Sequence, residues 1–444
     1  MKNDMLKGRI VKSIVLFALP IMASAALQYS YNLIDNIIVG RYISEDALAA
    51  VGGIGPVNNF IIGTALGLTG GFTIPVSQKF GAGDKKAMNL YAGSSILLSA
   101  FIGIIIAVLA HLVSNPILRL INTPENIIEM SAAYVNILYF GVPLQMLFNN
   151  FTSIARAVGD SKKPTLFIII SVITNLVLDI LFVGVFNRGV EGAALATVIS
   201  YAVAMFFSGI YVLRKQPLLS IKKSDLKPNF KIQWEQLKLG IPVSLQFTIT
   251  SVGSMILQSA INSFGSTAVA AITAAGRVEQ ITNIPMSALG VGNSTFVAQN
   301  FGAGNYKRII ASVRKILVLD LLISVVCSAV LILAGPYIVR LFIENPSAEI
   351  MDYAMQYLFT IGGCYSLVSL LFVFRNTLQG LGYTYANTIA GAGELLGRLL
   401  VAYFLTRLFG FVGVCFAGPA AWLLADIPLI ILYIRVKNCK LSKL

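Results

Sequence analysis

Four polar residues in the first half of the chain have the types and spacing to bind a cation or a proton. Asp35 lies inside one long apolar run, and Asn175 and Asp179 lie inside another. Asn175 and Asp179 are four residues apart, so on a helix they share one face. Their oxygen atoms are the ligands that hard cations prefer, and Thr197 could add a hydroxyl. Placing an Asp at the centre of a membrane helix costs about 2.5–3.5 kcal/mol, which favours a functional role.

Each of these residues also has a structural interpretation. Asp35 could lie near the membrane interface and pair with Arg41. Asn175 and Asp179 could belong to a polar network that holds helices together. Thr197 could donate its hydroxyl to a carbonyl of its own helix, as threonine often does.

The second half of the chain carries opposite charges close together inside apolar runs. Glu279 lies two residues after Arg277, and Glu394 lies four residues before Arg398. The second spacing is that of an ion pair within one helix, and pairing is the less costly way to bury charge in a membrane. Glu279 is also a candidate for binding a cationic ligand. Two further acidic residues in apolar runs are weaker candidates: Asp320 and Asp426.

The composition indicates an integral membrane protein. The chain has 444 residues, of which 57% are hydrophobic and 12% are charged, whereas soluble proteins carry about 25% charged residues. A net charge of +14 raises the question of nucleic-acid binding, but most Lys and Arg residues lie in short segments between apolar runs, where they set membrane topology. One histidine and four cysteines without a CxxC pair exclude a multi-histidine metal site and indicate neither a disulfide framework nor a zinc site.

Apolar runs of sufficient length predict twelve transmembrane helices, since a spanning helix needs about 20 predominantly apolar residues. Segments on the side of the N-terminus hold 26 Lys and Arg residues and the opposite segments hold five, which predicts that both termini are cytoplasmic. The predicted spans are 13–38, 47–77, 88–113, 128–149, 164–184, 190–213, 239–263, 268–298, 310–334, 350–373, 385–406 and 411–434.

The two halves of the chain repeat one another. FGAG occurs at 80–83 and at 301–304, and ALAAV at 47–51 matches AVAAI at 268–272, both at an offset of 221 residues. Each half has six predicted spans, so both halves enter the membrane in the same sense, as parallel repeats do. We therefore expect an all-α integral membrane protein of twelve transmembrane helices in two pseudo-symmetric six-helix bundles. The expected parts are an N-lobe, a basic cytoplasmic linker and a C-lobe, at 1–213, 214–238 and 239–444.

Several stretches resemble the multidrug and toxic compound extrusion (MATE) family of transporters, prokaryotic type. NLIDNIIVGRYISEDALAAVG, which contains Asp35, resembles the first-helix signature of the family. SQKFGAGDKK and AQNFGAGNYK resemble its second- and eighth-helix ends, and RAVGDSKKP at 156–164 resembles its loop before the fifth helix. The resemblance covers nearly the whole chain in order. It implies a two-lobe fold and the export of organic cations or other amphipathic drugs in exchange for Na⁺ or H⁺ by alternating access.

The resemblance also implies where the coupling ion binds. Some prokaryotic members combine a first-helix Asp, a fifth-helix Asn and Asp, and a sixth-helix Thr in one N-lobe site. Asp35, Asn175, Asp179 and Thr197 match this pattern residue by residue. Some members also carry a seventh-helix acid, and the span 239–263 has none.

The expected protein is therefore not an enzyme, and HExxH, GxSxG and phosphate-loop motifs are absent from its sequence. We expect no cofactor other than the coupling ion, small amphipathic or cationic substrates, no nucleic-acid partner and a monomer. The expected location is a bacterial or archaeal-type cytoplasmic membrane. The alternatives are a channel and a flippase for lipid-linked saccharides of a related two-lobe fold; the acidic interior of the N-lobe favours cationic cargo.

Overall fold

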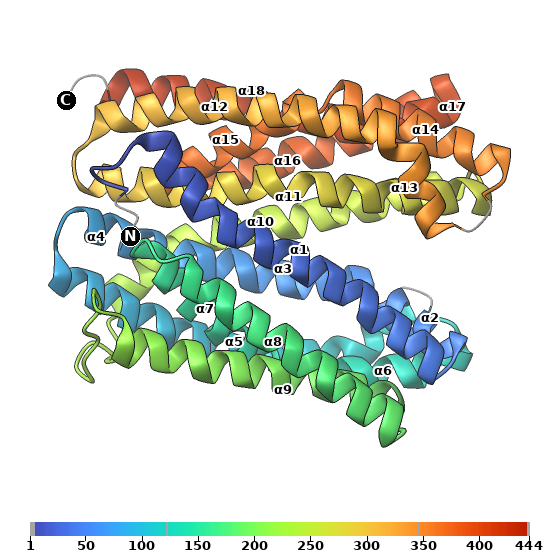
Figure 1. Ribbon diagram of the computed structural model, residues 1–444, viewed down its shortest axis with the longest axis horizontal. Coiled ribbons are helices and arrows are strands. Elements are labelled where there is room, and N and C mark those ends of the chain that lie inside the picture. The colour runs from blue at the N-terminus through green and yellow to red at the C-terminus, as the bar shows by residue number, and fades with distance from the viewer. Residues whose placement is uncertain (1–4, 121–122, 344–345, 442–444) are drawn as a thin grey trace. The chain divides into compact units, whose positions relative to one another are not determined.

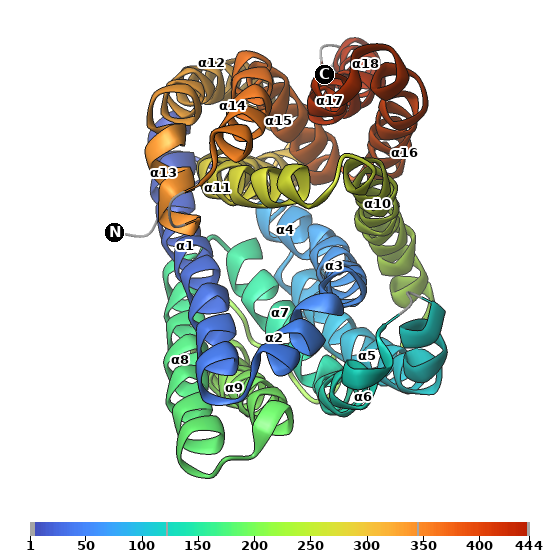
Figure 2. The ribbon, with the colours of Figure 1, turned by 90° about the vertical axis from the view of Figure 1, so that its right-hand side faces the viewer.

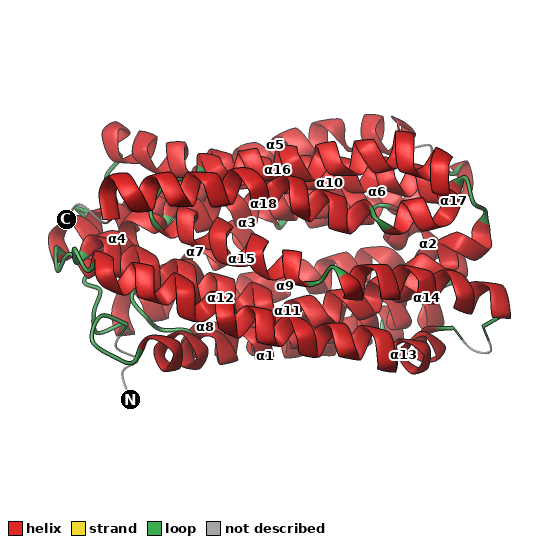
Figure 3. Cartoon of the chain, turned by 90° about the horizontal axis from the view of Figure 1, so that it is seen from above, coloured by secondary structure: helices red, strands yellow, loops and turns green. Residues whose placement is uncertain are grey.

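The computed structural model describes residues 5–120, 123–343 and 346–441, and all regular structure in these residues is helical (Figures 1 and 3). A membrane-spanning backbone must satisfy its N–H and C=O groups internally, and a helix does so within a single segment. The helices from the start of the chain are α1 (Ile10–Tyr42), α2 (Glu45–Gly53), α3 (Gly55–Phe72), α4 (Ile74–Gly81), α5 (Lys85–Leu120), α6 (Glu125–Phe140), α7 (Val142–Ala157), α8 (Lys162–Asp179) and α9 (Gly189–Ile210). They are followed by α10 (Phe230–Asn262), α11 (Ser266–Gly302), α12 (Tyr306–Ala329), α13 (Gly335–Phe342), α14 (Ala348–Gly363), α15 (Ser366–Gly380), α16 (Tyr385–Leu400), α17 (Thr406–Cys415) and α18 (Ala417–Val436).

Contacts between residues divide the described chain into two units. The first unit is Ala23–Ser244, and the second unit is the described residues up to Met22 together with those from Leu245 onward. The helices α2 to α9 belong to the first unit and α11 to α18 to the second, whereas α1 and α10 contribute to both (Figure 2). The sequence repeat assigns the residues before Ala23 to the N-lobe, 1–213. In the structure, the described residues of this stretch pack within the second unit.

The described residues contain nine to eleven candidate spans, against the twelve that the sequence predicts. Nine helices of the described residues are long and apolar enough to cross a membrane, and two bent pairs bring the number to eleven. These pairs are α6 with α7, bent by 45°, and α14 with α15, bent by 53°. The remaining predicted span, 268–298, lies in α11, which has 37 residues and extends about 55 Å at 1.5 Å per residue. This helix is long enough to cross a membrane, but it is not among the helices that are also sufficiently apolar.

Four of the predicted spans are not continuous helices. The predicted span 47–77 consists of α2, α3 and α4, and the predicted spans 128–149 and 350–373 are the two bent pairs. The predicted span 411–434 crosses the break between α17 and α18. Pro75 and Pro143 stand in the first turns of α4 and α7. A proline at this position has no intrahelical acceptor to lose and starts a new helix easily. The span prediction missed these breaks, because the apolar pattern of the sequence continues through them.

The repeat is visible in the backbone of each unit. The FGAG turns follow α4 and α11, and Gly83 and Gly304 adopt φ values of 73° and 71°. In each turn the residue after the glycine donates its N–H to the carbonyl five positions earlier, at 3.1 Å and 2.8 Å respectively, as in a Schellman cap. Gly189 and Gly410, also 221 residues apart, have φ values of 60° and 59°. The predicted duplication is therefore confirmed.

Glycines let α3 and α10 approach closely within the first unit. A Cβ atom on Gly71 would lie 2.4 Å from Cα of Gly240, and one on Gly67 would lie 2.6 Å from Cα of Ser244. Both glycines belong to the overlapping GxxxG spacing of α3, which favours close helix packing. The two helix backbones are in close contact at these two positions.

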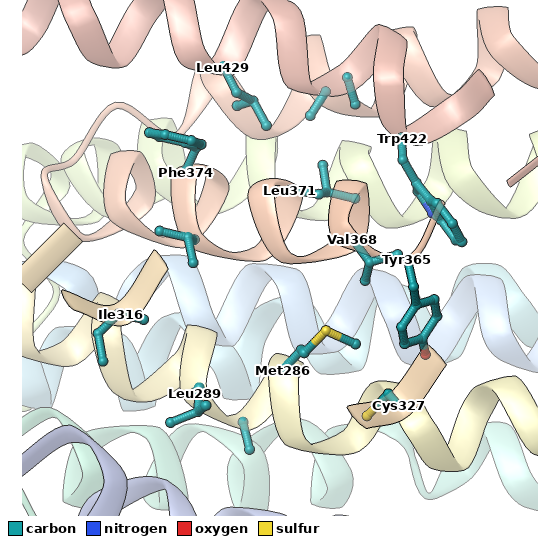
Figure 4. Packing of buried hydrophobic residues seen from close by; sticks show 14 of the residues in the cluster. Met286, Leu289, Ile316, Cys327, Tyr365, Val368, Leu371, Phe374, Trp422 and Leu429 are labelled. Atoms are coloured by element: carbon teal, nitrogen blue, oxygen red, sulfur yellow. The ribbon is translucent and has the colours of Figure 1, made fainter. Parts of the chain in front are cut away.

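The core of the second unit forms between α11, α12, α15 and α18 (Figure 4). Its largest fully buried side chain is Tyr365, which precedes α15. The Tyr365 hydroxyl lies 2.7 Å from Oγ1 of Thr282 in α11, so this buried polar group is satisfied between two helices. Residues that line the same cluster include Met286, Leu289, Ile316, Cys327, Val368, Leu371, Phe374, Trp422 and Leu429.

We predict that Gly71→Ala destabilises the protein by about 1–3 kcal/mol, because the added methyl overlaps the backbone of α10. The neighbouring Gly70→Ala is the matched control, since a Cβ atom at Gly70 meets no atom within 4 Å. Thermal unfolding of the purified variants in detergent, followed by the fraction that stays monodisperse, measures the effect. Equal melting temperatures for the two variants would contradict the prediction.

Candidate functional site

Three helices of the first unit bring the four predicted residues together. Asp35 comes from α1, Asn175 and Asp179 from α8, and Thr197 from α9. Asn175, Asp179 and Thr197 are buried, with 1%, 0% and 8% of their surface exposed, and Asp35 is half-buried. Asp179 is the last residue of α8 before a π-helical segment, Ile180–Val185. Such segments often occur at functional sites, where they change the direction of a side chain.

Asn175 connects the helices of the site. In the amide orientation that satisfies its neighbours, Asn175 Nδ2 donates to Asp179 Oδ2 and to the hydroxyl of Tyr31, both at 2.8 Å. In this orientation the amide oxygen of Asn175 accepts a hydrogen bond from Thr197 Oγ1 at 3.3 Å. The Thr197 hydroxyl also lies 3.1 Å from the carbonyl of Ala193, so the contact within its own helix is present as well.

The carboxyl groups of Asp35 and Asp179 lie within hydrogen-bonding reach of each other. Oδ1 of each carboxyl has no hydrogen-bond partner in the part of the chain that the structure describes. Arg41 is exposed and forms no ion pair with Asp35 among these residues. Two carboxylates this close repel each other unless a proton or a cation lies between them. The arrangement can therefore hold either, and its unpaired oxygens fit the coordination of a hard cation.

Three tyrosines surround this pair, and sequence reasoning missed all of them. Tyr31 of α1 contacts Asn175 as described, and Tyr134 of α6 and Tyr201 of α9 lie within electrostatic range of Asp35. Tyr31 precedes Asp35 by four residues and Tyr201 follows Thr197 by four, so helical spacing could have identified both. No such spacing connects Tyr134 to the predicted residues.

In the second unit, Glu394 is the centre of a buried ionic network. Its Oε2 lies 3.8 Å from Arg398 Nη2 and accepts a hydrogen bond from Thr250 Oγ1 at 3.1 Å. The predicted ion pair of Glu394 and Arg398 is therefore confirmed. Glu394 Oε1 also lies 3.4 Å from Arg375 Nη1. The predicted span ends at residue 373, but α15 continues to Gly380, and the Arg375 side chain is only 15% exposed.

Glu279 has partners that its sequence neighbours did not reveal. It lies in α11, two positions after Arg277. The hydroxyl of Tyr357 in α14 donates to Glu279 Oε2 at 2.7 Å, and Arg398 lies within electrostatic range. This carboxylate is thus part of a polar contact between α11 and α14. Nothing in the geometry assigns Glu279 or Arg277 to a substrate.

Asp320 and Asp426 are both buried, with 0% and 2% of their surface exposed. The sequence alone did not determine this burial. Neither carboxylate has a hydrogen-bond partner on either oxygen among the described residues. Asp426 lies within electrostatic range of Arg375, whereas no charged side chain in the described part of the chain acts on Asp320 in this way. Asp320 is therefore buried without the compensation that Glu394 has.

Comparison with known proteins gives a consistent result. The model of the MatE family matches residues 20–181 and 242–404, one match in each half of the chain. The chain is 31% identical over 411 residues to the probable multidrug resistance protein YpnP of Bacillus subtilis, covering 91% of this chain and 90% of that protein. It is 27% identical over 420 residues to the multidrug export protein MepA of Staphylococcus haemolyticus, and this match covers 93% of this chain and 92% of MepA.

A solved structure is similar over nearly the whole length of the chain. It is described as the outward-facing conformation of a multidrug resistance MATE family transporter of the MOP superfamily. The TM-score is 0.90 at 24% sequence identity, and the match covers 99% of this chain and 98% of the other. This similarity supports the all-helical fold.

We predict opposite effects on stability for two buried acids. Glu394→Gln removes the carboxylate that pairs with both Arg375 and Arg398 and should destabilise the protein by about 3–5 kcal/mol, the cost of breaking a buried ion pair. Asp320→Asn removes a carboxylate that has no partner and should leave stability equal or raise it. Thermal unfolding of the two purified variants checks this contrast. A larger loss for Asp320→Asn than for Glu394→Gln would show that the interpretation of these environments is wrong.

Proposed function

Because this chain belongs to the MatE family of multi-pass membrane transporters, we propose that it exports organic cations or other amphipathic drugs in exchange for Na⁺ or H⁺. The relatives that it matches over nine-tenths of their length are named multidrug resistance or multidrug export proteins. The proposed location is a prokaryotic cytoplasmic membrane with both termini on the cytoplasmic side, because 26 basic residues lie in segments on that side.

The observation that carries the coupling proposal is the pair of Asp35 and Asp179. Acids within a membrane are costly and are retained at ion pathways and proton relays. This pair shares a contact that requires a proton or a cation, and each acid keeps one unpaired oxygen. Asn175 fixes Asp179 through its amide, so the site is held in shape before an ion arrives.

The geometry of the pair bears on which ion binds. Carboxyl groups within hydrogen-bonding reach are suited to sharing one proton. Na⁺ would instead be bound by several oxygens at once. The oxygens available for this purpose are those of Asp35, Asp179, Tyr31 and Thr197. The same residues therefore serve either ion.

In the proposed cycle, the ion and the drug bind to different conformations of the transporter. Ion binding at Asp35 and Asp179 favours the conformation that releases drug outward, and drug binding from the inside favours the reverse change. Pro20 and Pro242 each lie two residues before the point where α1 and α10 pass from one unit to the other. A proline inside a helix removes a backbone hydrogen bond and permits bending, so these prolines are proposed as bending points.

A flippase for lipid-linked saccharides would need a site for an anionic cargo. The buried acidic pair favours a cationic cargo instead. A channel is the other alternative. A protein of two duplicated halves with buried acids fits an exchange cycle better than a continuous channel. The transporter is proposed to act as a monomer and without a cofactor.

The test is efflux of a fluorescent organic cation from proteoliposomes under an imposed Na⁺ or pH gradient. Wild-type protein should export the dye under one of the gradients, and that gradient identifies the ion. Asp35→Asn and Asp179→Asn should each lower the gradient-driven rate by about tenfold or more, because each removes a carboxylate from the coupling site. Each of these substitutions keeps the size of the side chain.

Asp46→Asn is the control, since Asp46 is an exposed residue of the same unit and the charge change is the same. It should transport at the wild-type rate. Wild-type rates in folded Asp35→Asn and Asp179→Asn would refute the coupling site. Absence of efflux under both gradients from folded wild-type protein would refute the exporter proposal itself.

A further inference from the structure

A cavity of about 860 Å³ lies at the start of α1 in the second unit. One wall is formed by residues 7–12 and Val15, and the other by Arg308 and Lys315 of α12. This cavity is separate from the acidic site, which belongs to the first unit. Neither the coupling site nor the ionic network around Glu394 uses any of its residues.

The lining of this cavity is strongly basic. Five of its nine residues are basic: Lys7, Arg9, Lys12, Arg308 and Lys315. The other four are uncharged: Gly8, Ile10, Val11 and Val15. Arg9, Lys12 and Lys315 are exposed and form no ion pair with an acidic side chain in the described residues. Positive residues at the cytoplasmic ends of helices are common, but here they converge on one concave surface. A concave surface lined by one sign of charge concentrates ions of the opposite sign.

Arg308 is fixed in position at this cavity. Its Nη2 donates to the carbonyls of Gly8 and Met5 at 2.8 and 3.2 Å, and its Nε donates to Asn300 Oδ1 at 3.2 Å. Its guanidinium also lies 5.4 Å from the centre of the Phe296 ring. These bonds hold both the guanidinium and the chain before α1, so the positive charge needs little rearrangement to meet an anion. Preorganisation of this kind lowers the cost of binding.

The remaining wall is apolar. Ile10, Val11 and Val15 are half-buried and line the cavity beside the cations. A free phosphate ion would gain nothing from this wall, whereas a molecule with an anionic head and a hydrocarbon tail would contact both surfaces. Basic pockets between transmembrane helices on the cytoplasmic side bind lipid head groups in this way. We propose that the cavity binds the phosphate head group of an anionic phospholipid, with its acyl chain along Ile10, Val11 and Val15.

Native mass spectrometry of the full chain in detergent tests the proposal, with phosphatidylglycerol and phosphatidylcholine added at equal concentration. Wild-type protein should retain phosphatidylglycerol in preference to phosphatidylcholine. In the double variant Lys12→Gln/Lys315→Gln, the amount of retained phosphatidylglycerol should fall by about tenfold or more, because two charges near the phosphate are removed. Both lysines are exposed, so the variant should fold, and its melting temperature without lipid verifies this.

The matched control is Lys85→Gln/Lys86→Gln, which removes the same charge from two exposed lysines of the first unit and should retain the lipid as wild type does. Equal loss of lipid in both double variants would overturn the proposal, because it would reflect net charge alone. Equal retention of the two lipids by wild-type protein would also overturn it. Displacement of phosphatidylglycerol by the same concentration of inorganic phosphate would identify a free-phosphate site and overturn the assignment to a lipid.

Discussion

A charged side chain inside a bilayer has no water to stabilise it, so the chain itself must supply a partner. The buried acids of this protein meet this constraint to different degrees. Glu394 is surrounded by Arg375, Arg398 and Thr250, and its charge is balanced. Asp35 and Asp179 face each other, and their contact is completed only by a proton or a cation. Asp320 has no partner among the described residues. The first arrangement stabilises structure, and the second creates a place for chemistry.

The two halves share a backbone plan and differ in their chemistry. Gly83 and Gly304 end equivalent helices with the same cap, and both halves contain one bent helix pair. The positions that correspond to Asn175 and Asp179 at the offset of 221 are Leu396 and Leu400. The second half therefore does not repeat the pair of Asn175 and Asp179 at the corresponding positions. Two similar scaffolds can accept different buried charges, because helix packing depends on side-chain shape along the interface rather than on any single polar residue.

The sequence was sufficient for features with a strong local signal. Long apolar runs predicted the spans, the shared offset predicted the duplication, and the spacing of Glu394 and Arg398 predicted their ion pair. It was insufficient where distant segments decide the outcome. Arg375 meets Glu394 only because α15 extends beyond its apolar run, and Tyr134 approaches Asp35 only through the packing of α6. The membership of Asp35, Asn175, Asp179 and Thr197 in one cluster was predicted, whereas their contacts required the structure.

The division of α1 between the two units has a consequence for synthesis of the protein. The part of α1 after Met22 packs within Ala23–Ser244, but the part before it packs with residues from Leu245 onward. The hydrogen bond from Arg308 to the carbonyl of Gly8 joins residues 300 positions apart. At about 5–20 residues per second, a ribosome needs roughly 15–60 s to add that length. The start of α1 must therefore wait, without its final neighbours, until the residues from Leu245 onward have been synthesised.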